Sequence, residues 1–253
     1  MTGARRRARL GAAVLWTLLI GCDGANPSTA TPADLQLALL VSHRVDVEEL
    51  SGLSLDVGGS RLWAVGGRRI YRLSLDGQVQ KRLDFAGDNL EGIAYDPADS
   101  TLWVVEEKRR EILHLDLDGG ILGSYRLDLT GPSNSGLEGI CVDADGRLRV
   151  VNEKNPVLLL SLGPELDISV RSEIPFADDL SGMDCGKEPG RFWLVSDQSQ
   201  TLYSWEPGAG LLGAATLPFK KAEGVAVNAD ARLAYVASES EKRLYIYSFA
   251  LPE

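Results

Sequence analysis

From residue 35 onward, short apolar segments alternate with polar turns along the chain. Within segments such as IYRLSLD (70–76), ILHLDLD (112–118) and LYIYSF (244–249), apolar residues recur at every second position. A period of two is that of a β-strand with one buried face, and the many β-branched and aromatic residues favour the same structure. After residue 22 we find no segment with a convincing helical period. The pattern therefore predicts an all-β protein.

One short motif recurs five times: Leu or Ala, then Glu or Ser, then Gly, then an apolar residue. The copies begin at residues 50, 90, 137, 180 and 222, which are 40, 47, 43 and 42 residues apart. Each copy starts a short strand, and further strand-like segments follow it. Four antiparallel strands with a period of about 40–45 residues are typical of a propeller blade. The repeat predicts a five-bladed β-propeller built from four-stranded antiparallel blades.

The two ends of the repeated region complete each other. The fifth repeat stops after its third strand, at SFALPE, while residues 36–47 (QLALLVSHRVDV) precede the first motif as a fourth strand would. We therefore expect the last blade to be closed by the N-terminal strand, which leaves no open edge in the ring. An aromatic residue recurs in the second strand and is expected to pack between blades. It is found at Trp63, Trp103, Trp193 and Tyr235, with Arg149 in the third repeat.

The first 34 residues have the composition of a targeting signal followed by a linker. Residues 5–9 are rich in arginine, and residues 10–20 are apolar. This apolar segment is too short to span a bilayer core, which requires about 20 residues. Residues 19–22 (LIGC) resemble the lipobox of bacterial lipoproteins, which predicts removal of residues 1–21 and acylation of Cys22; an ordinary signal peptide is the alternative. Residues 22–34 then form a flexible tether, and 35–253 the propeller. We expect a membrane-anchored lipoprotein of the bacterial cell envelope, facing the periplasm or the exterior.

The net charge limits the classes of partner, and the cysteines raise the question of a disulfide. The formal net charge is −10, and without residues 1–21 the chain has 22 basic against 36 acidic residues, or −14. Such a surface repels phosphate backbones, so we expect no nucleic-acid partner and an affinity for cations. Cys141 and Cys185 can pair in an oxidising compartment or remain two buried thiols.

Acidic residues recur at two positions that a propeller brings to one mouth of its channel. The motif supplies Glu91, Glu138 and Glu223, and the turn after the second strand supplies Glu107, Glu153, Asp197 and Glu239. Crowded carboxylates repel one another, and a hard cation such as Ca²⁺, which takes six to eight oxygen ligands, relieves the repulsion. Only two histidines are present, which argues against zinc or copper. Solvated turn acids are the alternative interpretation.

Two classes of function fit these residues. The first is a binding module that uses calcium to hold an unknown small-molecule or protein ligand at the acidic mouth. The second is a calcium-dependent hydrolase of a phosphoester, ester or lactone, with a metal-bound water as nucleophile. Lys108 and Lys154 each follow an acid and could bind a phosphate, or could be solvated turn lysines. A structural envelope protein without a small-molecule ligand is a third possibility.

Segments such as GLEGICVDADGRLRVVNEKNP and KAEGVAVNADARLAYVASES make the chain similar, over roughly residues 36–250, to the SdiA-regulated (YjiK-like) family. The resemblance implies a five-bladed propeller, distantly similar to NHL-repeat propellers, with a calcium site and commonly an envelope location. The family's acidic motif residues fall on the seven carboxylates named above. Gly66 and Gly67 in the first repeat depart from that pattern, because they offer no side-chain ligand.

Overall fold

The computed structural model describes residues 35–130 and 135–251, which form twenty β-strands and no helix. The predicted signal segment, the tether and Cys22 lie outside these residues. Within them, no helix is long and apolar enough to cross a membrane.

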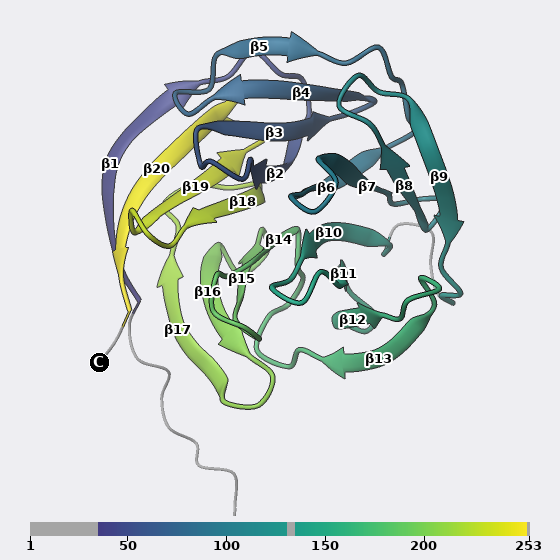
Figure 1. Cartoon of the computed structure of the whole chain (residues 1–253). Helices are drawn as coiled ribbons and strands as arrows, with labels where there is room; N and C mark the ends of the chain where they lie inside the picture. Colours follow the sequence, from purple (N-terminus) through teal and green to yellow (C-terminus); the bar gives the residue numbers. More distant parts are fainter. Residues whose placement is uncertain (1–34, 131–134, 252–253) are drawn as a thin grey trace, which may run out of the picture. The chain divides into compact units, whose positions relative to one another are not determined.

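The strands form five four-stranded antiparallel sheets around a central axis (Figure 1). Blade 1 contains β2 (Leu50–Leu55), β3 (Arg61–Gly66), β4 (Arg69–Ser74) and β5 (Val79–Arg82). Blade 2 contains β6 (Leu90–Asp96), β7 (Thr101–Glu106), β8 (Glu111–Leu115) and β9 (Ile121–Arg126). Blade 3 contains β10 (Leu137–Val142), β11 (Leu148–Asn152), β12 (Leu158–Leu162) and β13 (Ile168–Glu173). Blade 4 contains β14 (Gly182–Cys185), β15 (Phe192–Ser196), β16 (Thr201–Glu206) and β17 (Gly210–Thr216).

Blade 5 joins the two ends of the described chain. It contains β18 (Ala222–Asn228), β19 (Leu233–Ser238) and β20 (Arg243–Ala250), and its outermost strand is β1 (Gln36–Arg44). The pairing runs from Gln36 opposite Ala250 to Arg44 opposite Arg243. The predicted all-β, five-bladed fold and its closure by the N-terminal strand are confirmed.

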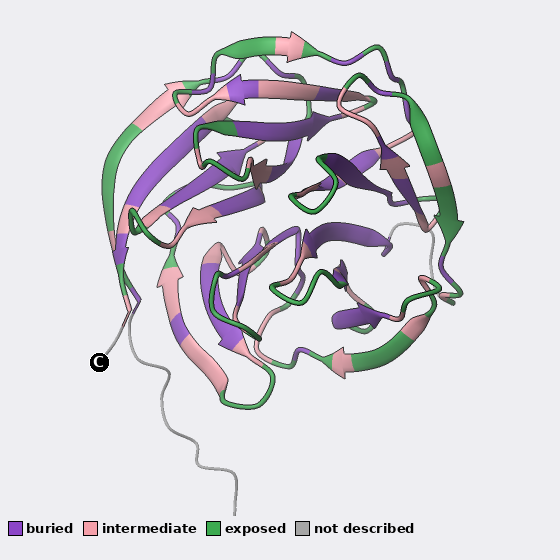
Figure 2. Ribbon diagram, viewed as in Figure 1, coloured by how far each residue is buried: buried purple, intermediate pink, exposed green. Residues whose placement is uncertain are grey.

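The hydrophobic core lies between the blades, where purple buried strands face each other in Figure 2. Trp63 of blade 1 packs with Leu90 and Ile93 of blade 2, and Trp193 of blade 4 lies 4.7 Å from Phe249 of blade 5, measured between ring centroids. The recurring aromatic residue therefore packs between blades, as expected. In blade 3 its place is taken by Arg149, which forms an ion pair of 2.7 Å with Asp143.

Five motif glycines bring the inner strands of adjacent blades into backbone contact. A Cβ atom at Gly52 would lie 2.7 Å from the Glu91 carbonyl oxygen, and one at Gly182 would lie 2.3 Å from the Glu223 carbonyl oxygen. These distances leave no room for a side chain. The same approach recurs at Gly92, Gly139 and Gly224. The glycine ring therefore packs the backbone tightly around the axis, directly beside the motif carboxylates.

A disulfide joins Cys141 on β10 to Cys185 on β14, with their Cα atoms 5.5 Å apart. It connects the inner strands of blades 3 and 4 near the ends opposite to the motif. Of the two states that the sequence left open, the structure has the bonded one.

Candidate metal centre at the channel mouth

Three repeated positions bring side chains to one mouth of the channel. We call them the lead position, directly before the motif; the motif position, its second residue; and the return position, directly after the second strand. The lead residues of blades 1 to 5 are Glu49, Asn89, Gly136, Asp179 and Lys221. The motif residues are Ser51, Glu91, Glu138, Ser181 and Glu223. The return residues are Gly67, Glu107, Glu153, Asp197 and Glu239.

Backbone hydrogen bonds fix the three positions relative to one another. The amide of the return residue donates to the carbonyl of the lead residue in blades 2, 3 and 5. The N···O distances are 3.2 Å for Glu107 to Asn89, 2.9 Å for Glu153 to Gly136 and 2.9 Å for Glu239 to Lys221. In these three blades the bond holds the backbone of the return residue beside that of the lead residue.

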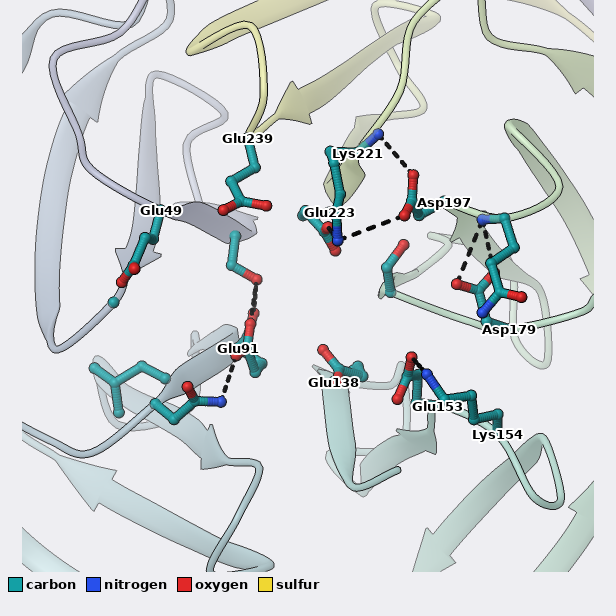
Figure 3. Close-up of a pocket in the computed structure, with 16 residues that line it drawn as sticks. Glu49, Glu91, Glu138, Glu153, Lys154, Asp179, Asp197, Lys221, Glu223 and Glu239 are labelled. Carbon is teal, nitrogen blue, oxygen red and sulfur yellow. Dashed lines mark hydrogen bonds and ion pairs between the residues drawn. The ribbon is translucent and has the colours of Figure 1, made fainter. Parts of the chain in front are cut away.

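These residues enclose a cavity of about 340 Å³ (Figure 3). Six of the seven predicted carboxylates line it: Glu91, Glu138, Glu153, Asp197, Glu223 and Glu239. Glu107 does not line the cavity, but its carboxylate belongs to a buried cluster beside it. Of the two predicted lysines, Lys154 lines the cavity. Lys108 is exposed on the rim, where its Nζ atom lies 3.3 Å from Asn89 Oδ1.

Glu107, Glu138 and Glu153 form the tightest carboxylate cluster. One oxygen from each of them lies within 4.8 Å of the other two. Glu138 is 8 % exposed, and no hydrogen bond or ion pair reaches its carboxylate from the described residues. Burial raises the pKa of Glu138 well above its usual value, and the neighbouring carboxylates raise it further. A buried carboxylate without a partner is costly unless a proton or a cation neutralises it.

The cluster meets the requirements of a hard divalent cation. Calcium binds oxygen ligands at about 2.3–2.6 Å, so two ligands of one ion can be up to about 4.8 Å apart. The three closest donors are all carboxylate oxygens, without nitrogen or sulfur. Lys154 forms an ion pair with Glu153 and neutralises part of the charge, which leaves a net negative cluster. Glu107, Glu138 and Glu153 could therefore hold Ca²⁺, with further ligands from water or a bound molecule.

Neighbouring side chains satisfy the carboxylates of blade 2. Asn89 Nδ2 donates to Glu91 Oε1 at 2.6 Å and to Glu107 Oε2 at 2.8 Å, so one amide joins the motif and return acids. Ser51 Oγ of blade 1 donates to Glu91 Oε2 at 3.0 Å. Burial raises the pKa of Glu91 to about 7, although the bond from Ser51 opposes the shift.

A lysine joins the return carboxylate of blade 4 to the motif carboxylate of blade 5. Lys221 Nζ lies 3.3 Å from Glu223 Oε1 and 3.5 Å from Asp197 Oδ2, and the Lys221 amide donates to Asp197 Oδ1 at 2.7 Å. Burial raises the pKa of Glu223 to about 8, although the charge of Lys221 opposes this shift. Burial alone would lower the pKa of Lys221, but the charges of Glu223 and Asp197 outweigh it and raise the pKa.

Sequence reasoning identified the motif and return positions and missed the lead position. It therefore found only two lysines near the mouth, whereas Lys221 also lines the cavity. It also expected no acid beside Gly67, but Glu49 supplies one: a Cβ atom at Gly67 would lie 2.5 Å from Glu49 Oε2. Four of the five lead residues are charged or carry an amide, but they share no single chemical type that would mark the position as a repeat.

Neither histidine belongs to the site. His43 is on β1, and His114 on β8 stacks on Trp103 with ring centroids 3.8 Å apart. The chemistry of the mouth is that of carboxylates, amides and ammonium groups, which bind cations and polar molecules.

The fold is similar to several solved propellers. The glutaminyl cyclase of Myxococcus xanthus aligns with a TM-score of 0.69 and 15 % identity, covering 88 % of this chain and 100 % of the cyclase. The Cps50 (Swd1) propeller domain of Myceliophteria thermophila aligns with a TM-score of 0.53 and 10 % identity, covering 84 % and 99 %. Virginiamycin B lyase from Staphylococcus aureus aligns with a TM-score of 0.50 and 18 % identity, covering 79 % and 66 %. At these identities the likeness concerns the fold alone.

Sequence comparison supplies the family. No curated protein matches the chain. The family described as SdiA-regulated matches residues 35–249, which is nearly the whole propeller. The chain belongs to the SdiA-regulated family.

Proposed function

We propose that this protein is an envelope-anchored calcium-binding propeller whose acidic mouth binds a ligand or a partner. The ion is held by Glu107, Glu138 and Glu153. The observation that carries the proposal is Glu138: a carboxylate that is 8 % exposed, faces two other carboxylates and receives no hydrogen bond from the described chain. The anchor is the acylated Cys22 expected from the sequence.

The structure of blade 3 supports this position for the ion. In blade 2 an asparagine amide lies between the acids, and in blade 5 a lysine ammonium does. The lead residue of blade 3 is Gly136, which has no side chain to offer. A Cβ atom there would lie 2.6 Å from the Glu107 carbonyl oxygen, so a larger residue does not fit. Lys154 pairs with Glu153, so Glu138 is the acid of blade 3 that would depend on a group from outside the chain.

We favour a binding module over the hydrolase. Hydrolysis by a metal-bound water needs a general acid or base placed apart from the metal ligands. Most of the remaining carboxylates of the cavity already have partners: Glu91 has Ser51 and Asn89, Asp179 has Ser196, and Asp197 and Glu223 have Lys221. Glu49 and Glu239 line the cavity beside them (Figure 3). A cavity of about 340 Å³ with polar walls is suited to a small polar molecule or to a projecting side chain of a partner.

Calorimetric titration of the full-length mature protein, stripped with a chelator, tests the ion. We expect calcium to bind with a measurable heat and magnesium to bind more weakly, because Mg²⁺ demands a tighter octahedron than three fixed carboxylates provide. Glu138→Gln should weaken calcium binding at least tenfold. The matched control is Glu165→Gln, which removes an exposed acid on a distant turn and should leave binding unchanged. Equal binding by the wild type and Glu138→Gln would contradict the proposal.

A further inference from the structure

The mouth contains two complete sets of three carboxylates. A set consists of the return residue of the preceding blade, the motif residue and the return residue of the same blade. In blade 3 the set is Glu107, Glu138 and Glu153, and in blade 5 it is Asp197, Glu223 and Glu239. The other blades have a serine or a glycine in at least one of these positions. The repeat therefore places acids at the same three positions twice, two blades apart, although among the described residues only the oxygens of the blade 3 set lie within 4.8 Å of one another.

The two sets differ in the lead residue that faces them. In blade 3 it is Gly136, which has no side chain; Lys154 pairs with Glu153 there, and Glu138 receives no partner from the described residues. In blade 5 it is Lys221, whose Nζ atom lies 3.5 Å and 3.3 Å from the oxygens of Asp197 and Glu223. Figure 3 shows Lys221 and Glu223 across the cavity from Glu138 and Glu153. The ammonium of Lys221 thus lies between two of the three carboxylates of its set.

We propose that Lys221 is a built-in cation that fills the second carboxylate set, so that the mouth binds one calcium ion in blade 3 and none in blade 5. This inference rests on the proposed calcium site. A lysine attached to the chain has a high effective concentration at its carboxylates and cannot diffuse away, so a free ion competes poorly for them. Lys221 thus sets both the number of ions and the side of the mouth on which the ion lies.

The arrangement has a consequence for the ligand. With calcium in blade 3 and the ammonium in blade 5, two positive centres of different strength face each other across the cavity. Calcium keeps coordination places for oxygen atoms of a ligand, whereas the ammonium offers only hydrogen-bond donors. The mouth is therefore polar but asymmetric.

Removing Lys221 should open the second site. The variant Lys221→Gly reproduces the lead residue of blade 3, and glycine tolerates the positive φ of 54° at this position. We expect the calcium stoichiometry of the full mature protein, measured by calorimetry and equilibrium dialysis, to rise from one ion in the wild type to two in Lys221→Gly. Adding Glu223→Gln should return it to one. Lys220→Ala removes the neighbouring exposed charge as a control and should keep one ion.

Each outcome separates the inference from the calcium proposal. One ion in the wild type and one in Lys221→Gly would overturn the role of Lys221 and leave the blade 3 site intact. No ion in the wild type would overturn the calcium site itself. A Lys221→Gly protein that does not fold at saturating calcium would also contradict the inference, because the second ion is expected to replace the charge of the ammonium.

Discussion

Gly224 of blade 5 lies so close to Ser51 of blade 1 that a Cβ atom at Gly224 would be 2.3 Å from the Ser51 carbonyl oxygen. This contact closes the ring between its last and first blades. It also holds Ser51, whose hydroxyl donates to Glu91, at the height of the carboxylates. The glycine of the motif is therefore part of the framework that positions the site.

Gly224→Ala should destabilise the propeller by about 1–3 kcal/mol, because the added methyl group meets backbone atoms that cannot rotate away. The matched control is Gly208→Ala, since nothing lies within 4 Å of a Cβ atom there. Urea unfolding followed by circular dichroism measures both variants. Equal stability of Gly224→Ala and Gly208→Ala would show that the inner strands can move apart without cost.

Reduction of the disulfide should lower the stability of the fold. Cys141 and Cys185 are 44 residues apart, and closing a loop of that length stabilises a protein by about 4 kcal/mol in the chain-entropy estimate. We expect the urea midpoint to fall in the presence of a thiol reductant. The double variant Cys141→Ala/Cys185→Ala should have a low midpoint with or without reductant. A wild-type midpoint that does not respond to full reduction would contradict a stabilising disulfide.

Metal-free protein should lose stability as the pH rises from about 5 to about 8. Burial raises the pKa of Glu91 to about 7 and of Glu223 to about 8, from an ordinary value of 4.5. In this window the folded protein keeps protons that the unfolded chain has released, so rising pH favours unfolding. Burial also raises the pKa of Glu138, and calcium must displace the proton of this proposed ligand, so the stabilising effect of calcium should grow with pH.

Unfolding midpoints at several pH values, with chelator and with calcium, measure this dependence. Glu223→Gln should flatten the metal-free slope. Asp184 lies on β14, away from the mouth, and burial raises its pKa to about 7. It therefore adds to the same dependence of metal-free stability on pH. Asp184→Asn should therefore reduce the slope without changing the response to calcium. Metal-free stability that is constant or increases between about pH 5 and about pH 8 would contradict this account of the mouth.

The sequence was sufficient for the fold because the repeat fixes it. Five motifs at similar spacing predict five blades, and the SFALPE ending with the unpaired segment 36–47 predicts how the ring closes. The motif and return acids could be located for the same reason, because equivalent positions in the repeats lie at the same level along the propeller axis.

The lead position was not predicted because its five residues occupy equivalent positions in the blades but differ in chemical type. Glu49, Asn89 and Lys221 all have positive φ values, of 50°, 64° and 54°, and this backbone feature is not apparent from residue identity. The lysines show the same limit. Lys108 and Lys154 each follow a return acid, yet only Lys154 lines the cavity. The Lys108 side chain turns to Asn89 and the Lys154 side chain to Glu153, and the sequence pattern does not contain this difference in direction.

The most direct test of the central claim is a crystal structure of the protein grown with calcium, with the ion located by anomalous scattering. We predict one peak among Glu107, Glu138 and Glu153, at about 2.3–2.6 Å from an oxygen of each, and no peak between Asp197 and Glu223. A peak in another place, or no peak at saturating calcium, would contradict the claim that this propeller holds one calcium ion in blade 3.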